Sequence, residues 1–153
     1  MNEQQGYDVE DLSVGMSACY GKTVTDADIV LFAGVSGDNN AVHTNQEFAA
    51  TTIFGGRIAH GMLSASLISA AVGTRLPGAG AVYLGQTLHF RAPVRPGDTV
   101  NTTITVKSVD LNRARVVLET VCRVGTTVVV DGEANVMVTS SVRRLAKANT
   151  SAS

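Results

Sequence analysis

The sequence predicts an α+β domain in which an antiparallel sheet of about five strands packs around one central helix. Three features lead to this prediction: short helical segments after a first strand, one long apolar helix, and a second half made of alternating runs separated by short turns. The chain has 153 residues, of which 44% are apolar and 16% are charged. This length and composition are sufficient for one domain with a full hydrophobic core.

The first half is expected to begin with a strand over residues 16–24. Thr25 is then a suitable N-cap for a short helix that ends near Gly37, with two acidic residues in the first turn, where the helix dipole favours negative charge. A second short helix is predicted over residues 45–52, with Asn45 as its cap.

The longest predicted helix covers residues 60–76. One of its faces is apolar, and the other consists of small residues rather than charged ones. A helix without a charged face is typically buried on most sides. We therefore place this helix at the centre of the domain, with Met62 and Leu67 in the core.

The second half alternates apolar and polar residues, as expected for strands with one buried face. The predicted elements are, in order, an extended run over 81–94, a turn at 95–98, and alternating runs over 100–106, 114–122 and 128–138. We expect a β-bulge at Gly132 in the last run. Long β-branched strands joined by short turns favour an antiparallel meander.

The two ends of the chain are expected to be less ordered than the domain between them. Residues 1–13 predict a loosely ordered segment, residues 14–142 form the predicted domain, and residues 143–153 predict a flexible tail. The N-terminal segment lacks the apolar core of a signal peptide, and no run is long and apolar enough to span a bilayer. We therefore expect a cytoplasmic protein without a membrane partner.

Charge and cysteine content argue against several classes of function. The net charge of −1 and the lack of a basic patch disfavour nucleic-acid binding. Cys19 and Cys122 have neither metal-site nor redox-motif spacing and are interpreted as small buried residues in a reducing compartment. The three histidines, His43, His60 and His89, are too scattered to predict a zinc site. The sequence thus predicts neither a metal nor another resident cofactor.

A carboxylate and an imidazole stand five residues apart in the segment SGDNNAVH, between two apolar runs. Taken singly, Asp38 is typical of a residue that caps a turn, and His43 of a histidine satisfied within a core. Together, the two groups can transfer protons in both directions near neutral pH when they share a water molecule. Asn40, between them, has a neutral amide that can orient a carbonyl or a water.

The longer segment FAGVSGDNNAVHTNQEFA resembles the hydratase-2 motif of the MaoC-like (R)-specific enoyl-CoA hydratases. The matching residues are Asp38, Asn40, Val42, His43 and Ala49. Ala41 stands where that family usually has proline, so the loop is expected to be slightly less constrained. The resemblance continues through RIAHGMLSASL and YLGQTLHFRAPVRPGDTV and covers the chain from about Val14 to Val138.

The resemblance implies the hot dog fold and the reversible syn hydration of trans-2-enoyl-CoA, with crotonyl-CoA as a typical short-chain substrate. It implies that Asp38 and His43 hold one water and share the proton transfer. It also implies that the backbone N–H of Gly61, at the start of the central helix, binds the thioester oxygen. Coenzyme A is part of the substrate, so no separate cofactor is implied. A homodimer or larger homo-oligomer is expected, because a long exposed sheet edge is normally covered.

Other residues are weaker candidates for substrate binding. Asn40 lies inside the motif, and Ser66 matches a family serine that faces the active site. A serine bonded to a carbonyl of its own helix is an equally good interpretation of Ser66. Arg57 and Arg91 are candidates to meet the coenzyme A phosphates, against the alternative that both are solvated surface arginines. His60 precedes the central helix and is expected to orient the loop or cap the helix.

Two other classes of function remain as alternatives. A hot dog acyl-CoA thioesterase would use the same scaffold, but thioesterases usually lack the Asp-x-Asn-x-x-His loop. A non-catalytic acyl-CoA-binding module would be expected to have lost the Asp–His pair and to carry a DNA-binding or partner segment. The hydratase is favoured. The sequence leaves open the acyl chain length, the working direction, and the choice between coenzyme A and acyl carrier protein.

Overall fold

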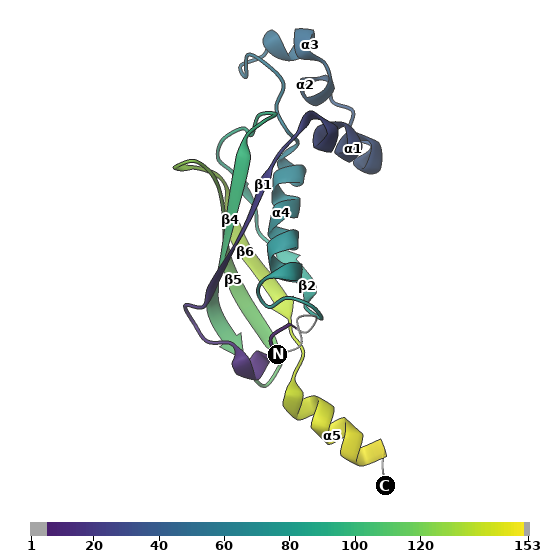
Figure 1. The fold of residues 1–153 in the computed structure, drawn as a ribbon, viewed down its shortest axis with the longest axis vertical. Helices are drawn as coiled ribbons and strands as arrows, with labels where there is room; N and C mark the ends of the chain where they lie inside the picture. The colour runs from purple at the N-terminus through teal and green to yellow at the C-terminus, as the bar shows by residue number, and fades with distance from the viewer. Residues whose placement is uncertain (1–5, 152–153) are drawn as a thin grey trace.

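The computed structural model describes residues 6–151, apart from the side chains of residues 148 and 151. In this part of the chain, six strands form one antiparallel sheet, with helices along it and at both of its ends (Figure 1). The α+β prediction is confirmed, with one strand more than the five expected.

The first half of the chain supplies one strand and a series of helices. The elements are the 3₁₀-helix η1 (Val9–Asp11), β1 (Ser17–Thr23), α1 (Asp26–Ser36), α2 (Ala41–Thr44), α3 (Gln46–Ala50) and α4 (Gly61–Thr74). Thr25 caps α1 as predicted, because its Oγ1 accepts a hydrogen bond from the Asp28 amide while the Asp28 carboxylate accepts one from the Thr25 amide. Gly37 ends α1 with φ of 78°, a left-handed conformation that favours glycine.

The second half of the chain supplies the rest of the sheet. The strands are β2 (Val82–Gln86), β3 (His89–Phe90), β4 (Thr99–Asp110), β5 (Arg115–Val124) and β6 (Thr127–Met137). The strand order is β1-β4-β5-β6-β2, and the short β3 also pairs with β6. The predicted meander is therefore present in β4, β5 and β6, while β1 and β2 occupy the edges.

The predicted β-bulge at Gly132 is wrong. Gly132 pairs with Thr120 in regular register, and the irregularity between β5 and β6 lies between Cys122 and Arg123 instead. Glycine is needed at 132 for a different reason, because a Cβ atom there would lie 1.8 Å from the carbonyl oxygen of Thr87. The chain at Thr87 thus lies tightly against β6 and separates β2 from β3, which the sequence had suggested as one run.

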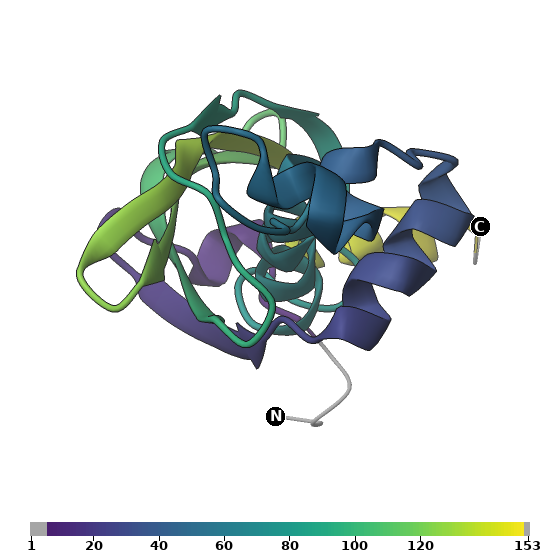
Figure 2. The ribbon, with the colours of Figure 1, turned by 90° about the horizontal axis from the view of Figure 1, so that it is seen from above.

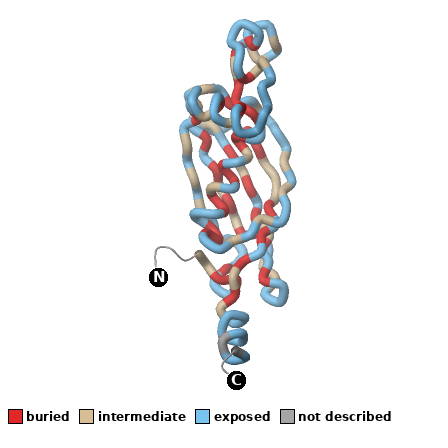
Figure 3. The backbone as a smooth tube through the Cα atoms, turned by 90° about the vertical axis from the view of Figure 1, so that its right-hand side faces the viewer, coloured by how far each residue is buried: buried red, intermediate tan, exposed pale blue. Residues whose placement is uncertain are grey.

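The sheet curves around α4, as the view from above shows (Figure 2). The buried face of α4 includes Leu67, Ile68 and Ala71, and the helix contacts β1, β4, β5 and β6. Buried residues concentrate between the sheet and this helix (Figure 3). Leu67 is in the core as predicted, whereas Met62 is 56% exposed.

The prediction that α4 is buried on most sides is wrong for the single chain. One face of the helix, which includes Ser66, Ser69 and Gly73, is exposed. The small uncharged residues on this face predicted burial. The sheet covers the opposite face of α4, but none of the described elements of this chain covers this one.

The N-terminal end of the described chain is better structured than predicted. Val9 is fully buried, and its amide donates a hydrogen bond to the Thr139 carbonyl at 2.8 Å, so residues 6–13 are not a loose segment. At the other end, α5 (Ser141–Ser151) is a helix that projects from the domain on the side opposite α1, α2 and α3 (Figure 1). The predicted flexibility of the tail stays a prediction. Residues 1–5 and 152–153 lie outside the described part.

Among the described residues, no helix has both the length and the apolar character needed to cross a membrane.

Candidate active site

A cavity of about 460 Å³ lies at the N-terminal end of α4. Its walls are the α1–α2 loop, the segment that leads into α4, and the chain from β3 to the following loop. The lining residues are Asp38, His43, Phe54, Ile58, Ala59, His60, Gly61, Met62, Phe90, Arg91, Ala92, Pro93, Val94 and Val130. The structure therefore brings together the three residues predicted for catalysis, Asp38, His43 and Gly61.

Asp38 is placed by the tight turn that follows α1. Its amide donates a hydrogen bond to Ser36 Oγ at 3.1 Å, and its carboxylate Oδ1 accepts one from the Asn40 amide at 3.2 Å. Asp38 thus has the capping role considered for it from the sequence. The same carboxylate also lines the cavity, so the structural and functional interpretations of this residue are compatible.

His43 lies on α2 and is only 8% exposed. Its Nδ1 is 2.8 Å from the carbonyl oxygen of Ile58. A carbonyl oxygen can only accept a hydrogen bond, so Nδ1 carries the proton and the neutral ring keeps a lone pair on Nε2. The fold therefore selects the tautomer of His43 in which Nε2 is available as a proton acceptor.

His60 lies beside both of these residues and is 1% exposed. Its Nε2 is 2.9 Å from the backbone oxygen of Asp38, and its ring stacks on that of His43 with centroids 3.8 Å apart and planes 30° apart. The potential ligand atoms of the three residues lie within 4.8 Å of one another. The structure therefore brings His43 and His60 together, although the sequence suggested that the histidines are scattered, whereas His89 lies in a separate cluster.

Gly61 is the first residue of α4. The amides at the start of an α-helix have no acceptor within the helix, and they lie at the positive end of its dipole. A Cβ atom on Gly61 would lie 2.8 Å from the ring of Phe90, so glycine keeps the space beside this amide open. The position is therefore suited to an electron-rich oxygen that approaches the backbone closely.

The structure does not bring Asn40, Ser66 or Arg57 to the cavity wall. Asn40 caps α2 by accepting a hydrogen bond from the Val42 amide at 3.2 Å. Ser66 donates a hydrogen bond to the Leu63 carbonyl at 2.6 Å, which is the alternative considered from the sequence. Arg57 forms an ion pair with Asp26. Their predicted roles toward the substrate stay predictions.

The sequence did not single out the aromatic walls of the cavity. Phe54 and Phe90 line it, together with Met62, which had been placed in the core. Phe90 is 54% exposed despite its size. Exposed large apolar residues beside a polar cluster indicate a binding surface, but no local sequence signal distinguishes such residues from a core.

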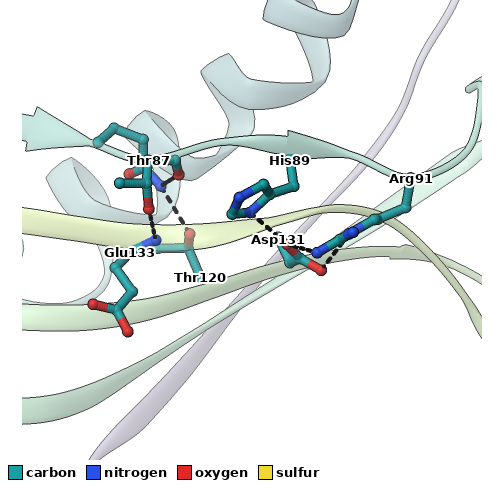
Figure 4. Close-up of polar contacts among 7 residues, drawn as sticks. Thr87, His89, Arg91, Thr120, Asp131 and Glu133 are labelled. Carbon is teal, nitrogen blue, oxygen red and sulfur yellow. Dashed lines mark hydrogen bonds and ion pairs between the residues drawn. The ribbon is translucent and has the colours of Figure 1, made fainter.

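A second histidine–carboxylate cluster lies on β3, β6 and the chain after β3, and we call it the β3–β6 cluster (His89, Arg91 and Asp131; Figure 4). Asp131 accepts hydrogen bonds from Arg91 Nε at 2.9 Å and Nη2 at 3.2 Å, and its Oδ1 is 3.1 Å from His89 Nδ1. These contacts, with Arg91 foremost, lower the pKa of Asp131. Arg91 also lines the cavity, whereas His89 and Asp131 do not.

Neither cysteine offers a nucleophile at the cavity. Cys122 is buried in the core, and this burial raises the pKa of its thiol. Cys19 is exposed on β1, so the interpretation of both cysteines as buried residues is wrong for Cys19. Neither cysteine lines the cavity. The described cavity therefore supplies a carboxylate and imidazoles, but no thiol, for chemistry on a thioester.

Comparison with known proteins agrees with this arrangement. Residues 14–131 match the family model described as a MaoC like domain. The chain is 54% identical over 129 residues to the (R)-specific enoyl-CoA hydratase of Rhodospirillum rubrum, covering 84% of this chain and 90% of the relative. It is 52% identical over 129 residues to the 3-hydroxybutyryl-CoA dehydratase of Methylorubrum extorquens, covering 84% of this chain and 82% of the relative.

Solved structures share the fold. R-hydratase PhaJ1 from Pseudomonas aeruginosa, in its unliganded form, matches with a TM-score of 0.84 and 46% identity, over 90% of this chain and 88% of that chain. The (R)-hydratase from A. caviae involved in PHA biosynthesis matches with a TM-score of 0.82 and 40% identity, over 84% and 98% respectively. This chain therefore belongs to the MaoC-like family and has the hot dog fold.

Proposed function

We propose that this protein is an (R)-specific enoyl-CoA hydratase, a hydro-lyase that reversibly adds water to trans-2-enoyl-CoA. The observation that carries the proposal is the meeting of Asp38, His43 and the Gly61 amide in one cavity. The names of the two curated relatives described above, at 54% and 52% identity, support the same activity. Short-chain thioesters such as crotonyl-CoA are the proposed substrates.

Hydration requires three events, and this cavity has a group for each. Asp38 and His43 hold a water, and its proton passes to the pair as the oxygen attacks C3 of the substrate. Negative charge that develops on the thioester oxygen is stabilised by the Gly61 N–H and the α4 dipole. The pair then returns a proton to C2, so that water has been added across the double bond and the residues regain their original state.

The stereochemistry follows from the position of the proton-transfer groups. Asp38 and His43 lie on one side of the cavity, so the hydroxyl at C3 and the proton at C2 are expected to arrive on the same face. We propose the R product because two relatives, 54% and 46% identical in sequence to this chain, are named an (R)-specific enoyl-CoA hydratase and an R-hydratase. Phe54, Met62 and Phe90 provide apolar surface for the acyl chain.

The proposed reaction uses no resident metal or other cofactor, because the protein's own groups supply both proton transfer and oxyanion stabilisation. Activity should therefore persist after dialysis against EDTA. We propose the cytoplasm as the site of action, which two unpaired cysteines support. The natural thiol carrier is proposed to be coenzyme A, with acyl carrier protein as the competitor to be tested with matched acyl groups.

We also propose that the protein acts as a homodimer. Strand β2 is an edge of the sheet, and its exposed residues Val82 and Leu84 are 47% and 46% accessible in the single chain. The uncharged exposed face of α4 offers further surface for a second copy. Edge-to-edge pairing of two sheets around a two-fold axis would cover β2. A fully active monomer in sedimentation at micromolar concentration would contradict this proposal.

The decisive experiment follows the loss of enoyl-thioester absorbance with crotonyl-CoA and longer homologues. In deuterium oxide, the 3-hydroxybutyryl-CoA product should carry one deuterium at C2, syn to the new hydroxyl. An R-specific dehydrogenase should oxidise this product, and an S-specific one should not. Release of free thiol without loss of the double bond would instead identify a thioesterase.

A further inference from the structure

His60 adjoins all three parts of the proposed catalytic site: its side chain contacts Asp38 and His43, and its backbone precedes Gly61. Its Nε2 is 2.9 Å from the backbone oxygen of Asp38, and its ring stacks on His43 at 3.8 Å. It is also the N-cap residue of α4, so its own peptide bond leads directly to the Gly61 amide. The side chain makes no capping hydrogen bond to the helix, so helix capping does not account for the histidine.

The hydrogen bond to Asp38 defines the protonation of the ring. The Asp38 backbone oxygen can only accept, so Nε2 must donate and must carry a proton. In the neutral ring, Nδ1 is then a lone pair. This is the tautomer opposite to that of His43, in which Nδ1 donates to Ile58. The two stacked rings therefore carry their protons on different nitrogens, and each donates to a backbone carbonyl next to the site.

The other nitrogen of His60 has no partner. Nδ1 is buried and makes no hydrogen bond among the described residues. A buried polar atom without a partner costs stability, and an apolar ring of similar shape would avoid that cost. Phe32 already packs nearby, with its ring centroid 5.0 Å from that of His60, so the surroundings are suited to an aromatic ring rather than to a second polar atom.

We propose that His60 is a positioning residue that holds the Asp38 carboxylate in reach of His43 by donating its Nε2 proton to the Asp38 backbone oxygen. The unsatisfied Nδ1 is the stability cost of keeping a ring that both donates this hydrogen bond and stacks on His43. His60 does not transfer protons to the substrate, because its Nε2 is engaged and its Nδ1 is buried. This inference rests on the proposed hydratase function for its kinetic test.

Three substitutions separate the donor from the ring. In glutamine, the amide nitrogen is as many bonds from Cβ as Nε2 is in histidine, so H60Q keeps the donor. H60N places its amide where Nδ1 lies and cannot reach Asp38, and H60F keeps an aromatic ring without a donor. We expect H60N and H60F to lower kcat by about 10²-fold with KM little changed, an effect typical of small misplacement of a reacting group. H60Q should retain at least about tenfold more activity than H60N.

The matched control is H89F, which removes the histidine of the β3–β6 cluster and should leave kcat unchanged. Thermal melting identifies variants that fail to fold. H60Q and H60N both lose the ring, so the ratio of their kcat values reports the hydrogen-bond donor alone. Wild-type kcat in both H60N and H60F would overturn the proposal. Equal losses in H60Q and H60N at equal stability would overturn it as well, because the donor would then not matter.

A double variant tests whether His60 acts through Asp38. In a D38N background, the correctly placed carboxylate is already absent, so adding H60F should lower kcat by less than about twofold further. Multiplying effects would show that His60 acts independently of Asp38 and would overturn its role as a positioning residue.

A measurement without substrate keeps this inference separate from the proposed function. In protein labelled with ¹⁵N-histidine, the His60 resonances should show a protonated Nε2 and an unprotonated Nδ1, while His43 shows the reverse pattern. A proton on His60 Nδ1 with none on Nε2 would overturn the inference even if the enzyme hydrates crotonyl-CoA. If the wild-type protein does not hydrate any enoyl-CoA, the proposed function fails, and the tautomer of His60 still decides whether it supports the Asp38 loop.

Discussion

Two histidine–carboxylate pairs lie near the same end of this sheet, and they differ in what surrounds them. Asp38 and His43 share a cavity with the start of α4, and His43 is 8% exposed. His89 and Asp131 lie on adjacent strands at the surface, where their side chains are 60% and 31% exposed. In the surface pair, Arg91 also forms two hydrogen bonds with the carboxylate.

The difference shows that proximity of an imidazole and a carboxylate does not define an acid–base pair. Arg91 engages both oxygens of Asp131 and lowers its pKa, so that carboxylate is held in its charged form. Solvent at the surface also screens the electrostatic interaction between His89 and Asp131. In the cavity, no described cation pairs with Asp38, and the hydrogen bond to Ile58 leaves His43 Nε2 available.

The largest effect is expected from substitutions in the cavity pair, with the surface pair as the comparison. Asp38→Asn and His43→Ala should each lower kcat by about 10²–10⁴-fold, the usual contribution of a general acid–base group. Asp38 lies in an exposed loop, so D38N should shift cooperative unfolding little. His43 is buried and bonded to Ile58, so H43A should lower the melting temperature, and its kcat is measured at a temperature where melting shows it folded. His89→Ala should leave kcat unchanged. Steady-state kinetics with crotonyl-CoA and thermal melting check all three variants, and near-wild-type rates in D38N or H43A would remove the basis of the comparison.

Gly61→Ala should have the next largest effect. The new Cβ would lie 2.8 Å from the Phe90 ring, so it would fill space beside the Gly61 amide and force that ring of the cavity wall to shift. We expect kcat/KM to fall by about 10–100-fold, less than the loss of up to about 10³-fold on complete removal of an oxyanion donor.

Gly34→Ala, inside α1 and outside the cavity lining, is the matched control. A Cβ there meets nothing within 4 Å, so activity should be unchanged and stability should rise by about 0.5–1 kcal/mol. Equal activities of G61A and G34A would show that the start of α4 does not bind the substrate closely.

A smaller effect is expected from restoring the family proline in the catalytic loop. Ala41 is the first residue of α2, a position that favours proline, and Asn40 has φ of −54° and ψ of 129°, which suit the residue before proline. Ala41→Pro should stabilise the protein by about 0.4–1 kcal/mol, mainly by restricting the unfolded chain, with kcat retained. Denaturant unfolding measures this, and a loss of stability would mean that the loop must move away from this conformation.

The smallest effect concerns the pH dependence of the surface pair. Arg91 lowers the pKa of Asp131 below its ordinary value of 3.8 in the folded protein. The resulting stabilisation is present above the unfolded pKa and is lost as pH falls through the lower folded pKa. Wild type should therefore melt slightly above Asp131→Asn at pH 7, and the difference should vanish well below pH 3.8. A difference that grows toward acid pH would contradict the sign of this linkage.

Local sequence signals were sufficient for much of the fold and for the central pair. Alternation located the strands, Thr25 and Gly37 marked the limits of α1, and the spacing of Asp38 and His43 identified the loop. These features depend on residues close in sequence. The family resemblance supplied the role of Gly61, which composition and periodicity alone do not indicate.

Features that depend on distant contacts were missed or misjudged. The division between β2 and β3 results from the approach of Thr87 to Gly132, 45 residues apart. The N-terminal segment appeared loose because it is short and acidic, yet Val9 enters the core and Asp8 pairs with Arg144 at 2.5 Å. The pairing of Arg57 with Asp26 likewise could not be read from the local sequence.

The position of α5 has a practical consequence for linking this enzyme to others. Helix α5 leaves the domain at the end of the sheet opposite α1, α2 and α3, and η1 lies at that same end (Figure 1). A support attached through the C-terminus would therefore leave the mouth of the cavity facing solution. A second enzyme fused there would need a linker long enough to follow the whole sheet. The root-mean-square end-to-end distance of a flexible Gly/Ser linker is only about 5–6 Å times the square root of its number of residues. Shortening the linker should therefore abolish direct transfer of product between the two enzymes before it lowers the activity of either one.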